Sequence, residues 1–275
     1  MHSDPMKITR KNLALGAIAW AAMSQIGCAS PARAGVGHWR KVVLVELFTS
    51  QGCSSCPAAD AFVAELPRLG FQRDRVVPLT FHVDYWDDLG WPDPFASSRF
   101  TARQRRYAGL GRLASPNGSR APSGVYTPQM IVDGMVHFSG SQRDIALREI
   151  SRAGAVAPTF SIAAHTTTVR DQAQIVVQVQ SGKGATASGD WRVWAALAAK
   201  SARTVVPRGE NSGETLMEAA VVRAMSQEVP LTGQTISLSL SKPAPLAWNN
   251  AEVVVVVQSF TTGDIAAAVA MDIAL

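Results

Sequence analysis

The sequence predicts an α/β domain over residues 35–157, followed by an all-β domain over residues 158–275. Before Pro158, strand-like and helix-like apolar patterns alternate in the order β-α-β-α-β-β-α. After it, seven short strand patterns follow one another, separated by turns that contain glycine and asparagine. A series of this kind favours an antiparallel sandwich, so we expect an immunoglobulin-like β-sandwich packed against the first domain.

The first predicted strand, residues 42–48, is apolar on both alternating faces, which is typical of a strand covered on both sides. Glu46 is the exception. Pro57 and the apolar spacing behind it predict a helix. The dipeptide Asp133-Gly134 predicts a hairpin. The remaining expected elements are a strand at 76–83, an irregular aromatic loop at 84–94, a helix at 97–110, strands at 125–132 and 136–138, and a helix at 142–153.

The second domain is expected to hold strands at 160–165, 174–180, 191–198, 217–224, 235–240, 252–260 and 265–273. The apolar run 253–257 predicts a central, covered strand, because an exposed strand of this composition would aggregate. No cluster of acid, base and nucleophile is visible here, so we expect this domain not to be catalytic itself. Its polar run Arg-Gly-Glu-Asn at 208–211 is expected either to contact the first domain or to face a partner, and a plain surface turn is the alternative.

The composition is that of a folded chain. Of 275 residues, 47% are hydrophobic and 17% are charged, which allows a sizeable core and excludes a disordered chain. Glycine and proline occur in ordinary numbers and no internal period repeats, which excludes collagen-like and solenoid proteins. The formal net charge of +5 by itself would suggest a nucleic-acid or membrane partner.

That positive charge belongs largely to the N-terminus. Lys7, Arg10 and Lys11 precede an apolar stretch at 13–26 and a small-residue pattern, which together predict an export signal over residues 1–34. Both the general secretory and the twin-arginine routes remain open, and the stretch is too short to cross a membrane comfortably. Without the signal the formal charge falls to +2. We therefore expect a periplasmic or secreted protein with no nucleic-acid partner and no stable membrane insertion.

Of the three cysteines, Cys28 would leave with the signal, and the pair Cys53 and Cys56 would remain. This pair lies where a buried strand gives way to a helix. The free backbone N–H groups and the dipole at a helix N-terminus favour a thiolate at Cys53. Cys56, one turn into the helix, would then be the resolving thiol. The alternative is a permanent staple, which would stabilise little because its loop is so short.

Three separated runs, FTSQGCSSCP at 48–57, FHVDYWD at 81–87 and YTPQM at 126–130, resemble the DUF1223 family of bacterial secreted proteins. The resemblance extends over about residues 42–275 and includes RGEN in the second domain. It implies that the first domain is thioredoxin-like. It implies no particular activity, because none is assigned to the family.

The resemblance also implies roles for two further sites. Thioredoxin-like proteins place a cis-proline loop beside the cysteine pair, and Thr127-Pro128 resembles that loop. It would orient an extended peptide or a thiol substrate, whereas the alternative is an ordinary trans turn proline.

Glu46 lies near the position of the buried acid of thioredoxins and would take the proton of Cys56. The alternative for Glu46 is a structural ion pair with an arginine of the helix at 97–110.

The leading hypothesis is a thiol–disulfide oxidoreductase without a cofactor, acting on a protein or a small thiol or disulfide.

One rival is a metal-handling module in which Cys53, Cys56 and His82 hold a soft ion such as Cu(I), beside Asp84 and the acids that follow it. A structural histidine and a solvated acidic loop explain the same residues, so no metal ligand is predicted. The second rival is a non-enzymatic interaction protein with a structural disulfide. Neither a nucleophile elbow nor a phosphate-binding loop occurs in the sequence.

Overall fold

The computed structural model of the chain describes residues 40–118, 124–182 and 190–273. The expected export signal over residues 1–34 lies outside the described residues. None of the helices in the described ranges has the length and apolar character that a membrane span requires.

The first half of the described chain alternates strands and helices in the order that its sequence predicts. Its elements are β1 (Val43–Thr49), α1 (Pro57–Glu65), β2 (Val76–His82), the 3-10 helix η1 (Asp87–Leu89), α2 (Ser98–Leu110), β3 (Gln129–Val132), β4 (Val136–Ser139) and α3 (Arg143–Gly154). The aspartate-rich loop after β2 is irregular apart from η1, as expected.

The second half consists mainly of strands. Its elements are β5 (Phe160–Val169), β6 (Gln172–Ser181), β7 (Trp191–Val205), β8 (Thr215–Met225), β9 (Val229–Pro230), β10 (Thr235–Ser241), the 3-10 helix η2 (Trp248–Asn250), β11 (Ala251–Ser259) and β12 (Ile265–Asp272). Each strand predicted here is present, and the short β9 is an addition. The chain is therefore a mixed α/β protein with large sheets.

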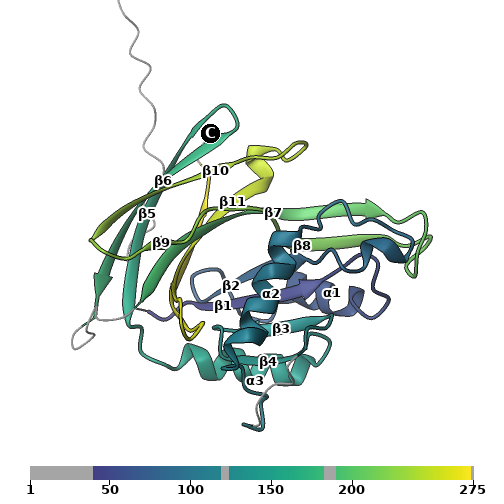
Figure 1. Cartoon of the computed structure of the whole chain (residues 1–275), viewed down its shortest axis with the longest axis horizontal. Helices are drawn as coiled ribbons and strands as arrows, with labels where there is room; N and C mark the ends of the chain where they lie inside the picture. The colour runs from purple at the N-terminus through teal and green to yellow at the C-terminus, as the bar shows by residue number, and fades with distance from the viewer. Residues whose placement is uncertain (1–39, 119–123, 183–189, 274–275) are drawn as a thin grey trace, which may run out of the picture. The chain divides into compact units, whose positions relative to one another are not determined.

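Two sheets organise these elements (Figure 1). The larger has nine strands in the order β12-β11-β7-β8-β2-β1-β3-β4, with β9 paired to β7, and the smaller has the order β10-β6-β5. In the larger sheet, β1 pairs in parallel with β2 and antiparallel with β3. Strands β7, β8, β11 and β12, which were expected in a separate sandwich, therefore continue the sheet of the first half.

The two halves meet where β8 runs parallel to β2. Thr80 is paired there with Val221, and Thr80 Oγ1 donates a hydrogen bond to the carbonyl oxygen of Ala219 at 2.8 Å. The expected boundary at Pro158 lies between α3 and β5. The sheet is continuous across the two halves, and the described residues belong to one compact unit.

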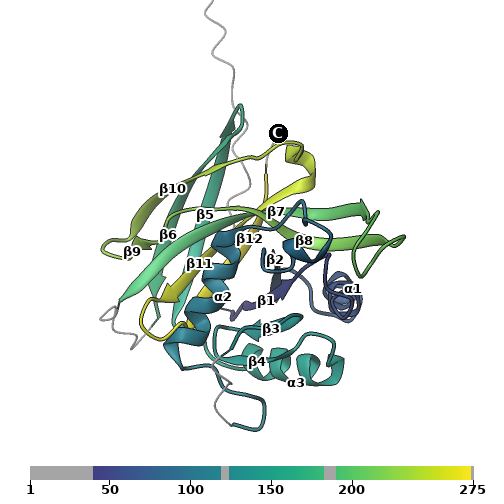
Figure 2. The same ribbon diagram turned by 45° about the vertical axis from the view of Figure 1, so that its right-hand side comes forward.

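Three apolar cores lie between the layers. The first lies between the two sheets and takes alternate residues from β5, β6, β7, β10 and β11. The second lies between α2 and the larger sheet, and the third lies between the opposite face of β1 and β3 and the helices α1 and α3. Figure 2 shows α1 and α3 on one side of these strands and α2 on the other.

Side chains along β1 alternate between these two faces because successive residues of a strand point in opposite directions. Val45 belongs to the core of α1 and α3, whereas Phe48 belongs to the core of α2. Glu46 is completely buried on the α2 face. Arg103 Nε donates to its carboxylate at 2.6 Å, and the Tyr107 hydroxyl donates to it at 2.5 Å.

Arg103 connects elements from both halves of the chain. Besides its ion pair with Glu46 in β1, it donates to Gln258 Oε1 of β11 at 3.1 Å. Its guanidinium carbon lies 4.2 Å from the ring centroid of Trp194 in β7. Because both charges of the ion pair are buried, removing one partner leaves the other without a counter-charge in the core.

The hairpin predicted at Asp133-Gly134 joins β3 to β4. Asp133 and Gly134 have φ values of 48° and 72°, the left-handed conformations that a tight hairpin turn requires. A Cβ atom on Gly134 would lie 2.0 Å from the carbonyl oxygen of Gly263. Glycine is therefore required at this position both by the backbone conformation and by the close approach of the turn after β11.

We expect Arg103→Met to lower the free energy of unfolding by about 3–5 kcal/mol, because it leaves the buried Glu46 carboxylate without a counter-charge. Urea denaturation of the purified protein measures this change. Arg105→Met, at an exposed position of the same helix, is the matched control and should change stability by about 0.5 kcal/mol or less. Equal stabilities of the two variants would contradict a central role for this ion pair.

Candidate functional site

The loop that follows β1 carries a disulfide. Cys53 and Cys56 are joined, with their Cα atoms 5.4 Å apart. Helix α1 begins directly afterwards, with Cys56 as its N-cap residue. Pro57 occupies the first turn, where its missing N–H is not needed. The prediction that a helix begins at the second cysteine is confirmed.

Both half-cystines are buried although the residues between them reach the surface. The exposed fraction is 1% for Cys53 and 0% for Cys56, while Ser54 and Ser55 are exposed. Cys53 Sγ lies 3.3 Å from Ser55 Oγ. A thiol that attacks the disulfide must therefore displace part of its cover.

Residues 207–213, at the tip of the β7–β8 hairpin, form part of this cover, and we call them the covering loop. The Glu210 carboxylate accepts a hydrogen bond from the backbone N–H of Ser54 at 2.9 Å. The side-chain amide of Asn211 donates to the carbonyl oxygen of Cys53 at 3.0 Å. The expectation that this Arg-Gly-Glu-Asn run contacts the first half of the chain is confirmed.

Trp86, in the aromatic loop after β2, connects the cysteine loop with Thr127-Pro128. Its Cβ lies 3.3 Å from the position that a Cβ on Gly52 would occupy, and its indole N–H donates to Thr127 Oγ1 at 2.9 Å. The Thr127–Pro128 peptide bond is cis, as the family resemblance implies. The structure therefore brings Thr127-Pro128 close to the cysteine loop.

The structure does not bring Glu46 to the disulfide. Its carboxylate lies on the α2 face of β1, bound by Arg103 and Tyr107, whereas α1 packs on the opposite face. The geometry therefore does not support Glu46 as the group that takes the proton of Cys56. It supports the alternative, a structural ion pair with an arginine of α2.

Asp60 is the acid that lies one helical turn after Cys56. Its backbone N–H donates to the Cys56 carbonyl oxygen at 3.1 Å, and residues four apart share one face of a helix. The side chain is buried. Thr49 Oγ1 donates to its Oδ2 at 3.0 Å, and its Oδ1 has no hydrogen-bond partner within the described ranges. Burial raises the pKa of Asp60 to about 7, with a partly opposing effect of His82. The carboxyl group can therefore gain or lose a proton near neutral pH.

His82 forms a buried group with two further acids. Its Nδ1 lies 2.7 Å from Asp93 Oδ2, and its Nε2 lies 3.7 Å from Glu218 Oε1. Burial disfavours the imidazolium, but the surrounding carboxylates, Asp93 foremost, outweigh it and raise the pKa of His82 to about 9. The charged His82 in turn holds the pKa of Asp93 below its usual value, although burial opposes this. A positive charge at His82 therefore offsets these buried acids at neutral pH.

Gln51 connects this group with the covering loop. Its backbone N–H donates to Asp93 Oδ2 and its Nε2 donates to Glu218 Oε2, both at 2.8 Å. Its carbonyl oxygen accepts from Asn211 Nδ2 at 2.8 Å, and its Oε1 accepts from Trp91 Nε1 at 3.2 Å. Gln51 thus joins the cysteine loop to the aromatic loop, to β8 and to the covering loop.

The geometry gives the metal hypothesis no support. In the part of the chain that the structure describes, no three His, Cys, Asp or Glu side chains are grouped as metal ligands. Cys53 and Cys56 are bonded to each other, and His82 Nδ1 is occupied by Asp93. Asp84, which that hypothesis also used, accepts a hydrogen bond from Thr101 Oγ1 at 2.5 Å.

Sequence patterns located the cysteine pair, Thr127-Pro128 and the covering loop, but missed Asp60, Glu218 and Gln51. A signal for Asp60 was present, because an acid interrupts the apolar face of α1 at a position where the helical period expects a core residue. Glu218 and Gln51 gave no comparable signal, since their contact joins segments far apart in the chain.

Comparison with known proteins identifies a family but no activity. No curated protein matches this chain. A crystal structure of a protein from Agrobacterium tumefaciens is similar to it, with 26% sequence identity, a TM-score of 0.58, and coverage of 85% of this chain and 96% of that one. HBP35 of Porphyromonas gingivalis shares the fold at 13% identity, with a TM-score of 0.60 and coverage of 86% of this chain and 76% of that one. The family described as protein of unknown function (DUF1223) matches residues 44–258, and this chain therefore belongs to the DUF1223 family.

Proposed function

We propose that this protein is a thiol–disulfide oxidoreductase whose exchangeable group is the Cys53–Cys56 disulfide. The observation that carries the proposal is the position of Asp60, a buried acid one helical turn after Cys56 with a pKa of about 7. Burying a carboxyl oxygen without a hydrogen-bond partner is unfavourable, and a structural disulfide has no use for such a group. A redox-active disulfide does need such a group, because the Cys56 sulfur must gain and lose a proton during exchange.

The exchange proceeds in two steps. A thiolate of a dithiol substrate attacks Cys53 Sγ, and the bond between the two cysteine sulfurs breaks. The Cys56 sulfur leaves as a thiolate and takes the proton of the Asp60 carboxyl group. The second substrate thiol releases its proton to water and attacks the substrate sulfur of the mixed disulfide. The substrate leaves as a disulfide and Cys53 as a thiolate, so two electrons pass to the protein. The reverse sequence oxidises the protein.

Two further features support this assignment. Cys53 precedes the N-terminus of α1, where the helix dipole and free N–H groups stabilise a thiolate. Thr127-Pro128 lies near the cysteine loop, where its backbone would pair with an extended peptide or a small thiol. The reaction needs no cofactor.

We also propose a finer description of the fold and of where the protein acts. The order β2-β1-β3-β4, with α1 and α3 on one face and α2 on the other, supports a thioredoxin-like unit. The packing of the β10-β6-β5 sheet over β7 and β11 supports an immunoglobulin-like sandwich that shares the larger sheet. The basic and apolar pattern of residues 1–34 supports export to the periplasm or the medium, where a disulfide persists.

A structural disulfide in a non-enzymatic interaction protein is the second candidate. The burial of Cys53 and Cys56 beneath the covering loop is the observation that favours it. The two candidates differ in whether the disulfide exchanges with an external thiol while the chain is folded.

Cys56→Ser separates these candidates most simply. We expect the folded variant to form a stable mixed disulfide at Cys53 with an aromatic disulfide reagent, because no resolving thiol is present. The reduced wild-type protein should pass through the same adduct and release it as its own disulfide forms. Mass spectrometry of the intact protein detects both species, and Cys53→Ser is the control that forms neither. Reaction of Cys56→Ser only after unfolding would support the structural candidate.

Asn211→Ala tests the covering loop. The variant loses the hydrogen bonds to the carbonyl oxygens of Gln51 and Cys53, so we expect the folded protein to be reduced about tenfold faster by a small dithiol. Thiol labelling during reduction measures the rate. Arg208→Ala, an exposed change in the same loop, should leave the rate unchanged. Equal rates in all three proteins would show that the covering loop does not control access.

Asp60→Asn tests the proton transfer. Above pH about 7 the Asp60 carboxylate accepts the Cys56 proton, so the wild-type rate of resolving a mixed disulfide should rise with pH through this value. We expect the variant to be roughly tenfold slower near pH 7.5, because an ordinary thiol is only about one tenth ionised there, and to approach the wild type above pH about 9, where Cys56 ionises unaided. Stopped-flow measurement of reagent release gives the profile.

Glu46→Gln is the matched comparison, since it alters a buried acid on the opposite face of β1. Its pH profile should keep the rise near pH 7 even if the protein is less stable. An unchanged profile in Asp60→Asn, or loss of the rise in Glu46→Gln, would contradict the assignment of Asp60.

A further inference from the structure

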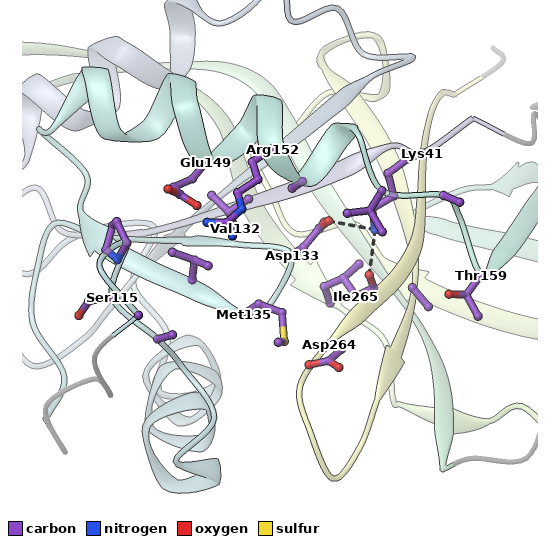
Figure 3. Close-up of a pocket in the computed structure, with 18 of the residues that line it drawn as sticks. Lys41, Ser115, Val132, Asp133, Met135, Glu149, Arg152, Thr159, Asp264 and Ile265 are labelled. Atoms are coloured by element: carbon purple, nitrogen blue, oxygen red, sulfur yellow. Dashed lines mark hydrogen bonds and ion pairs between the residues drawn. The ribbon is translucent and has the colours of Figure 1, made fainter.

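A cavity of about 470 Å³, whose lining residues are drawn in Figure 3, lies at the N-terminal end of β1. The disulfide follows the C-terminal end of the same strand. The cavity is lined by Lys41, the β3–β4 hairpin, α3 and the turn between β11 and β12. Sites for small molecules usually have volumes of about 300–1,000 Å³. The cavity is therefore separate from the proposed redox site and large enough for a ligand of its own.

The walls of the cavity are mainly apolar. Val132 and Val136 line it from the hairpin, and Trp191 lines it from the start of β7. Met135 and Val156 also belong to the lining and are among the large apolar side chains that remain exposed. These residues provide a surface that an apolar group of a ligand would cover.

One pair of charges in the lining is already satisfied. Lys41 Nζ lies 2.9 Å from Asp133 Oδ2 and donates to the carbonyl oxygen of Ile265 at 3.0 Å, as the dashed lines in Figure 3 show. Asp133 Oδ1 accepts from the backbone N–H of Leu44 at 2.8 Å. This pair fixes the hairpin to β1 and β12 and leaves little capacity for a ligand.

Glu149 and Arg152 are charged lining residues without such partners. They lie one turn apart on α3, and their side chains extend toward the strand that carries Val132 (Figure 3). Glu149 is only 8% exposed. Neither side chain forms a hydrogen bond or an ion pair with another described residue. Asp264, near Ile265, adds a buried Oδ1 without a hydrogen-bond partner in the described ranges.

The Glu149 carboxylate has no donor among the described residues, and a cationic group of a ligand would supply one. The planar guanidinium of Arg152 matches a carboxylate with two parallel hydrogen bonds. Side chains three residues apart on a helix have Cβ atoms about 5–6 Å apart, which suits a ligand whose opposite charges are adjacent.

We propose that this cavity binds a zwitterion with an apolar side chain, of the class of α-amino acids and short peptides. The ligand ammonium donates to Glu149, its carboxylate accepts from Arg152, and its apolar side chain packs against Val132, Val136 and Trp191. Asp264 supplies one further acceptor. The binding is independent of the redox chemistry proposed for the cysteines.

Isothermal titration calorimetry of the oxidised full chain tests the proposal with leucine and phenylalanine as probes. We expect saturable binding at millimolar or lower concentration. N-acetyl-leucine, which lacks the ammonium, and leucinamide, which lacks the carboxylate, should each bind at least about tenfold more weakly. This comparison needs no variant and therefore does not depend on the folding of one.

Glu149→Gln assigns the ammonium contact. It should weaken leucine binding about tenfold and leave the weak binding of N-acetyl-leucine unchanged, because that probe carries no ammonium. Arg148→Gln, an exposed change on the same helix, should have no effect. A Cys53→Ser/Cys56→Ser protein should bind leucine like the wild type, so failure of the redox proposal would not affect this result. Absence of saturable binding, equal binding of leucine and its two analogues, or an unchanged affinity in Glu149→Gln would overturn the proposal.

Discussion

The parallel contact between Thr80 of β2 and Val221 of β8 is the constraint on which the site depends. It joins the strand that ends in His82 to the hairpin that carries Glu218 and the covering loop, so residues from distant parts of the chain meet beside the cysteines. Next to it, Ala220 has a φ of 54°, a left-handed conformation that non-glycine residues rarely adopt. This unfavourable backbone conformation lies where the two halves of the sheet are joined.

Two buried charged groups lie on opposite faces of the joined sheet and differ in what they can do. On the α2 face, Arg103 holds Glu46 in a permanent ion pair, because a guanidinium does not lose its proton in a protein. On the α1 face, Asp60 and His82 have pKa values of about 7 and about 9, so this group can exchange protons in the range where thiols react. Of these two groups, the one on the face that α1 covers is therefore the one that can exchange protons near neutral pH.

Local patterns in the sequence predicted the elements better than their assembly. The two-residue period of β1 already separates Glu46 from Val45, yet it does not say which face α1 covers, and that choice decides whether Glu46 reaches Cys56. The glycine-flanked run of the covering loop was expected at an interface because its polarity stands out from the surrounding strands. The contact of Gln51 with Glu218, and the continuous sheet that creates it, depend on pairing between distant strands and left no periodic signal.

The reduction potential of the Cys53–Cys56 pair tests the central claim most directly. It is measured by equilibrating the folded protein with glutathione buffers and determining the fraction of free thiol. The account predicts a reversible two-electron equilibrium with a potential above about −300 mV, within reach of exchange partners. A potential below about −300 mV, or thiols that appear only when the chain unfolds, would show that the disulfide is structural and would contradict the account.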